Sequence, residues 1–317
     1  MSKPSVVVIG SSNTDMIIRL NHIPKPGETI LGGEFLTAAG GKGANQAVGA
    51  ARAGGAVTFV ARVGKDMFGQ QAVAGFVRDG IDVKHVLEDR ATPSGVALIF
   101  VAKDGENSIA VASGANGKLT PADVQRAKKV ISKASVVVMQ LETPLETVQT
   151  AAEMAAKAGA CVILNPAPAR PLPDKLLRQV SILTPNESEA ELLTGIKVKS
   201  LEAAAKAAEK LQAKGVKIVI LTLGAKGALI ADADGTKLFV PGFKVKAVDT
   251  TAAGDVFNGA LAVALAEGQE LTDAVAFANA AAAISVTRLG AQPSAPTRRE
   301  IERFLKANTC SCCGGKC

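Results

Sequence analysis

One run of residues near the C-terminus places small residues directly before a carboxylate, in a pattern that could transfer a phosphoryl group. In the run DTTAAGDVFNG, the small residues at 252–254 lead into a predicted helix over 255–266. Backbone N–H groups at a helix start, together with the helix dipole, form a binding hole for anions. Asp255 stands within reach of such an anion, where a carboxylate can accept a hydroxyl proton during phosphoryl transfer. An ordinary N-cap is the alternative for Asp255, but earlier residues of the run could cap the helix equally well.

Two further polar clusters lie at a predicted strand end and at a predicted helix start. Asn13 and Asp15 follow an apolar run at 6–9, and ligands of parallel α/β sheets collect outside the carboxyl ends of strands. These side chains can hydrogen-bond neighbouring hydroxyls of a polyol, with a turn cap as the equal alternative. In the run AAGGKGANQ, glycines allow a ligand close to the backbone, Lys42 adds a cation, and Asn45 adds a donor and an acceptor. A glycine-rich helix entry is the alternative there.

Two weaker features fit a nucleotide. In TPNESE, Asn186 and Glu189 come just after a predicted strand, where they could hold Mg²⁺ through water. A helix N-cap accounts for Asn186 equally well. The segment from Thr222 to Gly224 ends another predicted strand and could run beside a nucleotide, although an ordinary turn explains it too.

Several common catalytic motifs are missing from the sequence. The one Gly-Lys-Gly, at 41–43, is followed by Ala44, and the first strand runs into GSSNTD, so neither a P-loop nor a G-x-G-x-x-G turn is present. His22 and His85 are the only histidines, which disfavours His-based triads and three-His zinc sites. No G-x-S-x-G elbow occurs.

The elements that must position these clusters alternate along the chain. Short apolar runs separated by helices are typical of a parallel sheet that is buried on both faces. With right-handed crossovers, this pattern predicts an α/β fold, a three-layer α/β/α sandwich with a mostly parallel central sheet. The predicted strands are 6–9, 57–63, 135–140, 161–164, 180–183 and 216–221. The predicted helices are 44–53, 68–79, 145–158, 187–193, 201–214 and 255–266.

Two segments break this alternation, at about 15–38 and 95–112. Neither contains a helix pattern, and the second holds two strand-like runs around a Lys-Asp-Gly-Glu turn that favours a hairpin. We expect them to form a small β-sheet lid inserted into a single domain over 1–309. Apolar residues on this sheet would need a partner surface, which predicts a homodimer through the lid. The residues concerned are Ile17, Ile30, Leu98 and Phe100.

The composition of the chain indicates which classes of partner it could bind. The net charge is 36 − 29 = +7, but Lys and Arg are scattered and aromatics are only 3%, so we expect a field that attracts an anionic small substrate and no nucleic-acid partner. No apolar run reaches the ~18 residues of a spanning helix. We therefore expect no membrane partner and a cytoplasmic location. Four of the five cysteines lie at 310–317, which we expect to be a disordered tail.

The clusters together resemble the ribokinase-like carbohydrate kinases, the phosphofructokinase B-type family. The resemblance runs in order through residues 4–307, in GSSNTD, HIPKPGETILGGEFLTAAGGKGANQA, RVGKDMFG, NPAPA, TPNESEAELLTG, TLGAKGA and DTTAAGDVFNGAL. It implies ATP-dependent phosphorylation of the 5-hydroxyl of D-ribose. The alternatives are a kinase of the same family for deoxyribose or another pentose or ketose, and a sugar-binding regulator without turnover.

The resemblance also implies roles for individual residues, with Asp255 as the catalytic base. The implied sugar site is Asn13, Asp15, Gly41, Lys42, Asn45, Glu142 and Asp255. The implied anion hole is Ala252, Ala253 and Gly254. The implied ATP site is Asn186, Thr222, Gly224, Gly227, Ala253, Gly254 and Asn279. Glu189 is implied to help position Mg²⁺ through water. An activating K⁺ is implied at Asp249, Thr251, Ser285, Arg288, Gly290 and Ser294.

Overall fold

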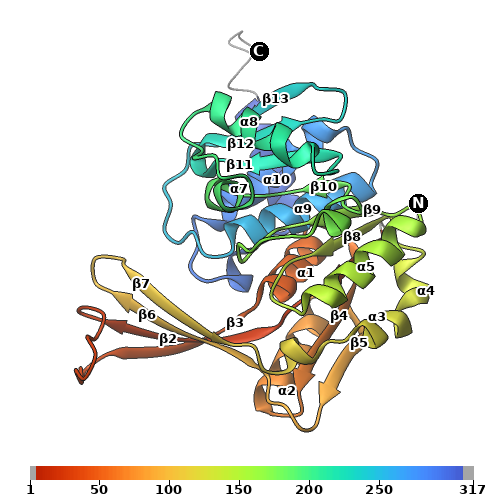
Figure 1. The fold of residues 1–317 in the computed structure, drawn as a ribbon. Helices are drawn as coiled ribbons and strands as arrows, with labels where there is room; N and C mark the ends of the chain where they lie inside the picture. Colours follow the sequence, from red (N-terminus) through yellow and green to blue (C-terminus); the bar gives the residue numbers. More distant parts are fainter. Residues whose placement is uncertain (1–4, 310–317) are drawn as a thin grey trace.

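A nine-stranded sheet forms the body of the molecule in the computed structural model, which describes residues 5–309 (Figure 1). Its order is β13-β12-β11-β10-β9-β8-β1-β4-β5, with antiparallel pairing only at β11-β12 and β12-β13 among the described strands. The strands are β1 (Ser5–Ile9), β4 (Ala56–Gly64), β5 (Asp82–Asp89), β8 (Val136–Met139), β9 (Cys161–Leu164), β10 (Ile182–Leu183), β11 (Ile218–Thr222), β12 (Gly227–Ala231) and β13 (Lys237–Pro241).

Helices cover both faces of this sheet, as the continuous apolar strands require. In β1, Val6 and Val8 belong to one core cluster while Val7 and Ile9 belong to the other, so successive side chains are buried on opposite faces. One face packs against α1 (Lys42–Arg52), α2 (Met67–Arg78), α9 (Ala253–Ala266), α10 (Leu271–Ser285) and α11 (Arg298–Thr309). The other packs against α3 (Pro121–Arg126), α4 (Lys128–Ile131), α5 (Leu145–Lys157), α6 (Asp174–Leu177) and α8 (Leu201–Gln212).

The predicted three-layer α/β/α architecture is confirmed, with several differences in detail. Helices α3, α4, α6, α10 and α11 were not predicted. The strand predicted at 180–183 is only Ile182–Leu183, because the Val180 amide closes a turn onto Leu177 after α6. The helix predicted from residue 255 begins at Ala253. Strands β5, β12 and β13 were not predicted; β12 and β13 form the antiparallel edge of the sheet.

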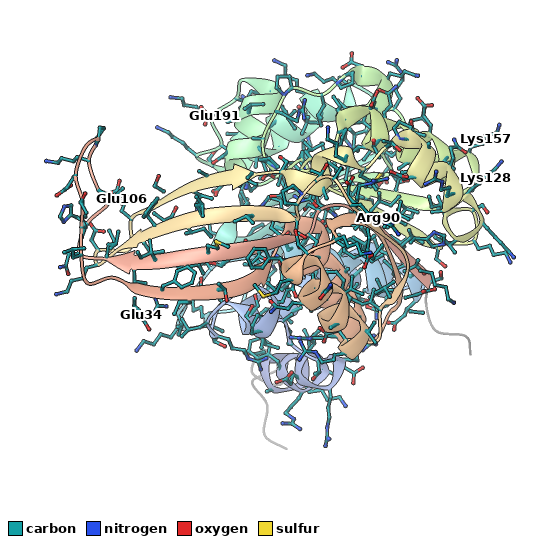
Figure 2. The ribbon with its side chains drawn as sticks, turned by 90° about the horizontal axis from the view of Figure 1, so that it is seen from below. Glu34, Arg90, Glu106, Lys128, Lys157 and Glu191 are labelled. Carbon is teal, nitrogen blue, oxygen red and sulfur yellow. The ribbon has the colours of Figure 1, made fainter. Side chains whose placement is uncertain are left out.

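A second, four-stranded sheet projects from the body (Figures 1 and 2). Its order is β3-β2-β6-β7, with β2 and β6 parallel and a β6–β7 hairpin at the predicted turn. The strands are β2 (Asn13–Leu20), β3 (Glu34–Gly40), β6 (Gly95–Ala102) and β7 (Asn107–Ala112). In Figure 2, Glu34 and Glu106 lie on this projection, and Lys128 and Lys157 lie at the opposite end of the molecule. That the sheet acts as a lid stays a prediction.

The projecting sheet carries exposed apolar side chains, as expected, but not all of the ones expected. Leu98 is 48% exposed, whereas Ile17, Ile30 and Phe100 are partly buried within the chain itself. Additional exposed apolar side chains on this sheet and its loop are Leu31, Phe35, Ile109 and Val111.

Helices α1 and α9 approach each other closely enough for their backbones to touch. A Cβ atom on Gly259 of α9 would lie 2.6 Å from the carbonyl oxygen of Gln46 and 2.7 Å from the amide nitrogen of Ala50, both in α1. Such distances are far shorter than van der Waals contact, so only glycine fits at this crossing. The contact brings the start of α1 beside the first turn of α9.

Within residues 5–309, no helix is both long enough and apolar enough to cross a membrane. The cysteine-rich segment at 310–317 lies outside the described residues.

The crossing of α1 and α9 predicts a local cost for any side chain at residue 259. We expect Gly259→Ala to lower the free energy of unfolding by about 1–3 kcal/mol, because an extra methyl group in a packed contact forces the helices apart. Urea denaturation measures this loss. Gly75→Ala in α2 is the matched control, since its Cβ would meet only Arg78 Nη2 at 3.8 Å and should be neutral or stabilising. Equal effects of the two substitutions would contradict the account.

Candidate active site

A cavity of about 170 Å³ opens at the carboxyl ends of β9, β10 and β11, where ligands collect in parallel α/β folds. It is walled by the first turn of α9, by the start of α7 (Glu187–Thr194) and by polar residues at or just after the ends of the three strands. Its lining is Lys42, Asn165, Ala167, Thr184, Asn186, Glu189, Thr222, Thr250, Ala252, Ala253, Gly254, Asp255 and Asn258.

Asp255 is the third residue of α9 and lies almost fully buried, at 5% exposure. Its Oδ2 accepts a hydrogen bond from Asn45 Nδ2 at 3.0 Å, and its Oδ1 accepts one from Gln46 Nε2 at 2.9 Å. The N-cap of the helix is Ala252, so the capping alternative for Asp255 is wrong. The carboxylate instead faces the cavity and is held by two amides of α1.

One cation and three further carboxylates surround Asp255. Burial raises the pKa of Asp255, while Lys42 and the two amide donors act to lower it. Asp15 has its pKa raised to about 6, first by burial and then by the nearby charges of Glu142 and Asp255. Burial acts to lower the pKa of Lys42, but the attraction of Asp255, Glu142 and Glu189 outweighs it and the net shift is upward. Lys42 therefore stays charged and offsets part of the acidic cluster.

The residues implied for the sugar converge beside Lys42. Glu142 Oε2 accepts from Ser11 Oγ at 2.5 Å and from the backbone N–H of Lys42 at 2.9 Å. Asn13 and Glu142 also line a neighbouring hollow of about 380 Å³. Gly41 is the N-cap of α1 with φ 89°, and a Cβ there would lie 2.6 Å from the Asn13 amide nitrogen. The positive φ and the close approach both require glycine.

The start of α9 has an unusual backbone. Ala252 adopts the left-handed conformation with φ 59°, the only described non-glycine residue to do so. This conformation costs an L-residue about 1–2 kcal/mol. The Ala253 amide donates to the Thr250 carbonyl at 3.2 Å, and the space above Gly254 is open for 4 Å. All three residues implied for the anion hole line the cavity.

The residues implied for ATP fall into two groups. Asn186 and Thr222 line the cavity. Asn186 is also the N-cap of α7, where its Oδ1 accepts from the Glu189 amide at 2.8 Å and Glu189 Oε2 accepts from the Asn186 amide at 2.9 Å, so the capping alternative is confirmed. Gly224, Gly227 and Asn279 are not among the residues that line the cavity, and Asn279 Nδ2 donates to the carbonyls of Val240 and Pro241. Their contact with ATP stays a prediction.

Sequence reasoning missed several polar residues of the site. Gln46 touches Asp255, and Asn165, Thr184 and Asn258 line the cavity. Asn116 donates to Asn13 Oδ1 at 2.7 Å and so fixes that side chain. Gln46 belongs to the run AAGGKGANQ and Asn165 to NPAPA, so both stand in segments that carry the family resemblance.

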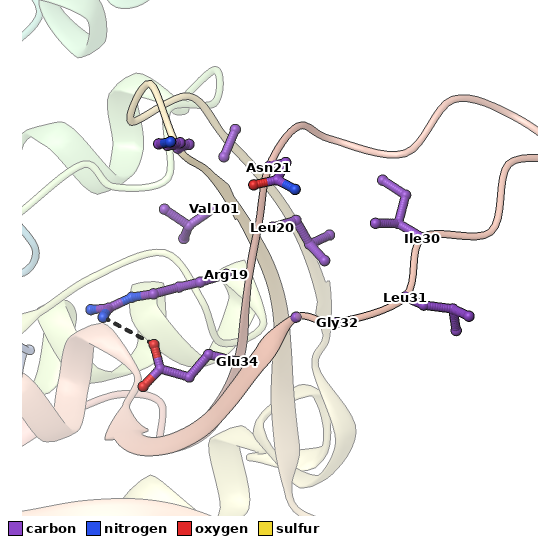
Figure 3. A pocket seen from close by; sticks show the side chains of 11 residues that line it. Arg19, Leu20, Asn21, Ile30, Leu31, Gly32, Glu34 and Val101 are labelled. Carbon is purple, nitrogen blue, oxygen red and sulfur yellow. Dashed lines mark hydrogen bonds and ion pairs between the residues drawn. The ribbon is translucent and has the colours of Figure 1, made fainter.

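A larger hollow, of about 450 Å³, lies at the outer end of the projecting sheet (Figure 3). Its walls come from strand ends and from the loop that carries Ile30 and Leu31. The Arg19–Glu34 ion pair in its wall spans 3.5 Å and is largely exposed, so solvent screens it. The cavity around Asp255, with its buried charges and convergent amides, is therefore the candidate active site.

Comparison with known proteins decides the family. The family model described as pfkB family carbohydrate kinase matches residues 3–298. The chain belongs to the pfkB family of carbohydrate kinases. Within that family, the chain is 46% identical to a ribokinase of Haemophilus influenzae, covering 96% of this chain and 99% of the relative. It is 40% identical to a deoxyribokinase of Salmonella typhimurium, covering 96% and 99%. A solved structure of Arabidopsis thaliana ribokinase complexed with ribose and ATP matches with a TM-score of 0.89 at 34% identity, covering 96% and 99%.

The charge cluster predicts the titration of Asp15. We expect Asp15 to change from carboxylate to carboxylic acid as the pH falls through about 6, because burial and two nearby carboxylates raise its pKa. Carbon-13 NMR of aspartate carboxyl groups, assigned with Asp15→Asn, measures the transition. Lys42→Met should move the transition to higher pH, since Lys42 lowers this pKa. Asp89, with a pKa of about 2, is the internal control. A transition near pH 4 for Asp15 would contradict the cluster.

Proposed function

We propose that this chain is an ATP-dependent ribokinase that transfers the γ-phosphate of ATP to the 5-hydroxyl of D-ribose. The observation that carries the proposal is the buried Asp255 carboxylate, held by two amides at the start of a helix whose first turn walls the cavity. The ribokinase relatives, matched over nearly the whole chain, support the choice of substrate.

The sugar lies between the projecting sheet and the start of α1. Asn13, Asp15 and Glu142 accept from its hydroxyls, and the Gly41–Lys42 backbone approaches it closely. Asn45 is suited to join them, because its Oδ1 is buried and has no partner among the described residues. A buried acceptor without a donor is costly, so a sugar hydroxyl that donates to it gains binding energy. These contacts aim one primary hydroxyl at the γ-phosphate.

The chemical step needs a base and a place for negative charge. Asp255 takes the proton from the 5-hydroxyl of the sugar while the oxygen of that hydroxyl bonds to the γ-phosphorus. The bond from the γ-phosphorus to the oxygen of ADP breaks in the same step. Backbone amides in the first turn of α9 stabilise the charge that develops on the transferring group. Lys42, which lies beside the same cavity, adds a positive charge.

Two cations fit the oxygen-rich surroundings. Mg²⁺ is commonly held through one or two carboxylates, water and substrate phosphates, and Glu189 lines the cavity with lone pairs left for such a water. Mg²⁺ neutralises charge on the phosphates when it is bound. For K⁺, the two implied segments are tied together where Asp249 Oδ2 accepts from the Gly290 amide at 2.8 Å. Hard oxygen donors suit such a cation, and it would steady the loop before α9.

The residues implied for K⁺ differ in which oxygen atoms they could offer to the cation. The Ser285 and Ser294 hydroxyls are buried and donate to carbonyls, which leaves their oxygens able to face a cation. Asp249 Oδ1 accepts from the Thr251 amide at 2.9 Å. The Arg288 side chain pairs with Glu300 at 2.6 Å, so only its backbone carbonyl is suited to this role.

The same proposal includes a homodimer through the lid and a cytoplasmic location. Exposed apolar side chains on the projecting sheet support the dimer. The location and the absence of nucleic-acid and membrane partners stay predictions.

A deoxyribokinase is the second candidate, because a relative of that name matches at 40% identity and the two sugars differ by one hydroxyl. A regulator without turnover is less well supported, because Asp255 and the helix start are both present.

An ADP-release assay with Mg²⁺ and ATP tests the substrate. We expect turnover with ribose above 2-deoxyribose, fructose, 2-keto-3-deoxygluconate and adenosine, and a higher rate in K⁺ than in Na⁺.

Asp255→Asn is the matched variant and should lose about 10²–10⁴-fold in kcat with little change in ribose binding, because the base is gone. The Asn45 amide can flip to accept from the new side chain, and its nitrogen can then donate to a sugar hydroxyl oxygen in place of the acceptor. Preference for deoxyribose would select the second candidate, and ribose binding without turnover would select the regulator.

Light scattering tests the dimer. At micromolar concentration we expect twice the mass of one chain. We expect Leu98→Asp on β6 to give the mass of a single chain, because it places a charge on the face that the two chains of the proposed dimer would bury between them. Leu192→Asp on α7 is the matched control, since both leucines are 48% exposed. A single-chain mass for the unmodified protein would contradict the dimer.

A further inference from the structure

Gln46 is a fully buried residue whose side-chain amide makes three hydrogen bonds to residues in or beside the candidate active site. Its Nε2 donates to Asp255 Oδ1 at 2.9 Å and to Asn165 Oδ1 at 3.1 Å. Its Oε1 accepts from Gln140 Nε2 at 2.6 Å. The four residues come from α1, α9 and the ends of β8 and β9, so the amide joins elements far apart in the sequence.

The direction of each amide in this chain follows from the groups at its ends. A carboxylate only accepts, so the Gln46 atom that faces Asp255 must be its nitrogen. Asn165 Nδ2 donates to the Thr184 carbonyl at 3.1 Å, so Asn165 turns its oxygen toward Gln46. Both hydrogens on Gln46 Nε2 are then used, and its oxygen is left for Gln140. Three neighbours therefore lock one orientation of the Gln46 side chain.

The chain of amides leaves one group unsatisfied. Gln140 Oε1 is buried and has no hydrogen-bond partner among the described residues. Gly10 packs against it so closely that a Cβ atom on Gly10 would lie 2.0 Å from Gln140 Oε1. A buried acceptor without a donor costs stability, whereas apolar side chains in place of both glutamines would avoid that cost. Stability alone therefore does not account for the pair.

The two oxygens of Asp255 are held differently. Oδ1 is bound by the locked Gln46, while Oδ2 is bound by Asn45, whose own Oδ1 has no partner and which is implied to bind the sugar. Asn45 can therefore turn when the substrate enters, and Gln46 cannot. This asymmetry leaves Oδ2 as the oxygen that meets the substrate hydroxyl.

We propose that Gln46, locked by Gln140 and Asn165, is a positioning residue that holds Oδ1 of Asp255 and so presents Oδ2 as the proton acceptor. This inference rests on the proposed function, since it assigns a role within phosphoryl transfer. The charged groups that face Asp255 are Lys42 of α1, Asp15 of β2, Glu142 after β8 and Glu189 of α7. A neutral substitution of Gln46 leaves all four in place, so its effect reports on the hydrogen bond.

The test uses Gln46→Met and Gln140→Leu, with Gln212→Met as the matched control. Gln212 likewise makes three hydrogen bonds, in which its Nε2 donates to backbone carbonyls, but it lies on α8 and does not line the cavity. We would measure kcat and KM for ribose and ATP against pH, together with urea denaturation. For Gln46→Met we expect the acidic limb of the pH profile of kcat to move to higher pH by about one to two units. The reason is that a hydrogen-bond donor to the charged form of the base is lost. We also expect the plateau of kcat to fall by about tenfold to a hundredfold, with KM changed by less than about threefold.

Gln140→Leu should move both quantities in the same direction by a smaller amount, because Gln46 remains but is less firmly held. Gln212→Met should move neither. An acidic limb that stays in place in Gln46→Met and Gln140→Leu would overturn the inference, even if stability falls, because that result describes a structural role. If Gln46→Met does not fold, the limb of Gln140→Leu decides. Failure of the unmodified enzyme to phosphorylate ribose would instead overturn the proposed function.

Discussion

The structure depends on keeping one carboxylate charged and correctly turned in a place from which water is nearly excluded. Burial alone favours the neutral acid, so Asp255 needs compensation from its surroundings. Lys42 supplies a charge, and Asn45 and Gln46 supply directed donors. All three stand in the first turns of α1, and the glycine crossing of α1 and α9 brings that helix within hydrogen-bond distance. The close packing of α1 against α9 therefore also places the groups that compensate the charge of Asp255.

The same cluster gives the two sides of the site different electrostatic character. On the side proposed for the sugar, burial and then the nearby charges of Glu142 and Asp255 raise the pKa of Asp15. On the side proposed for the nucleotide, the amides at the start of α9 favour negative charge. In the proposed function, a neutral polyol would relieve the repulsion by donating hydroxyl hydrogens to the carboxylates, and the phosphates would accept from the amide donors. This distribution of charge would favour the sugar on one side of the site and the phosphates on the other.

Sequence patterns predicted the framework well because its signals are local. The apolar runs at β1, β8 and β9 are each only four or five residues long, and each helix-free segment of the second sheet is one continuous stretch of the chain. The polar clusters were found for the same reason, since they stand at strand ends and helix starts. Gln46 was missed because its contact with Asp255 spans 209 residues, and a buried amide looks the same in sequence as an exposed one. The start of α9 was misplaced by two residues, because an alanine in the left-handed conformation has no sequence signature.

That alanine has a consequence for how the site can vary during evolution. Glycine at residue 252 would relieve a backbone cost of about 1–2 kcal/mol. It would also add about 0.5–1 kcal/mol of conformational freedom to the unfolded chain, which offsets much of that relief. Glycine is therefore at most about 1.5 kcal/mol more stable than alanine here, so mutation can exchange the two at a small cost. A β-branched residue would clash more severely with its own backbone in this conformation, so valine, isoleucine and threonine are disfavoured at this position.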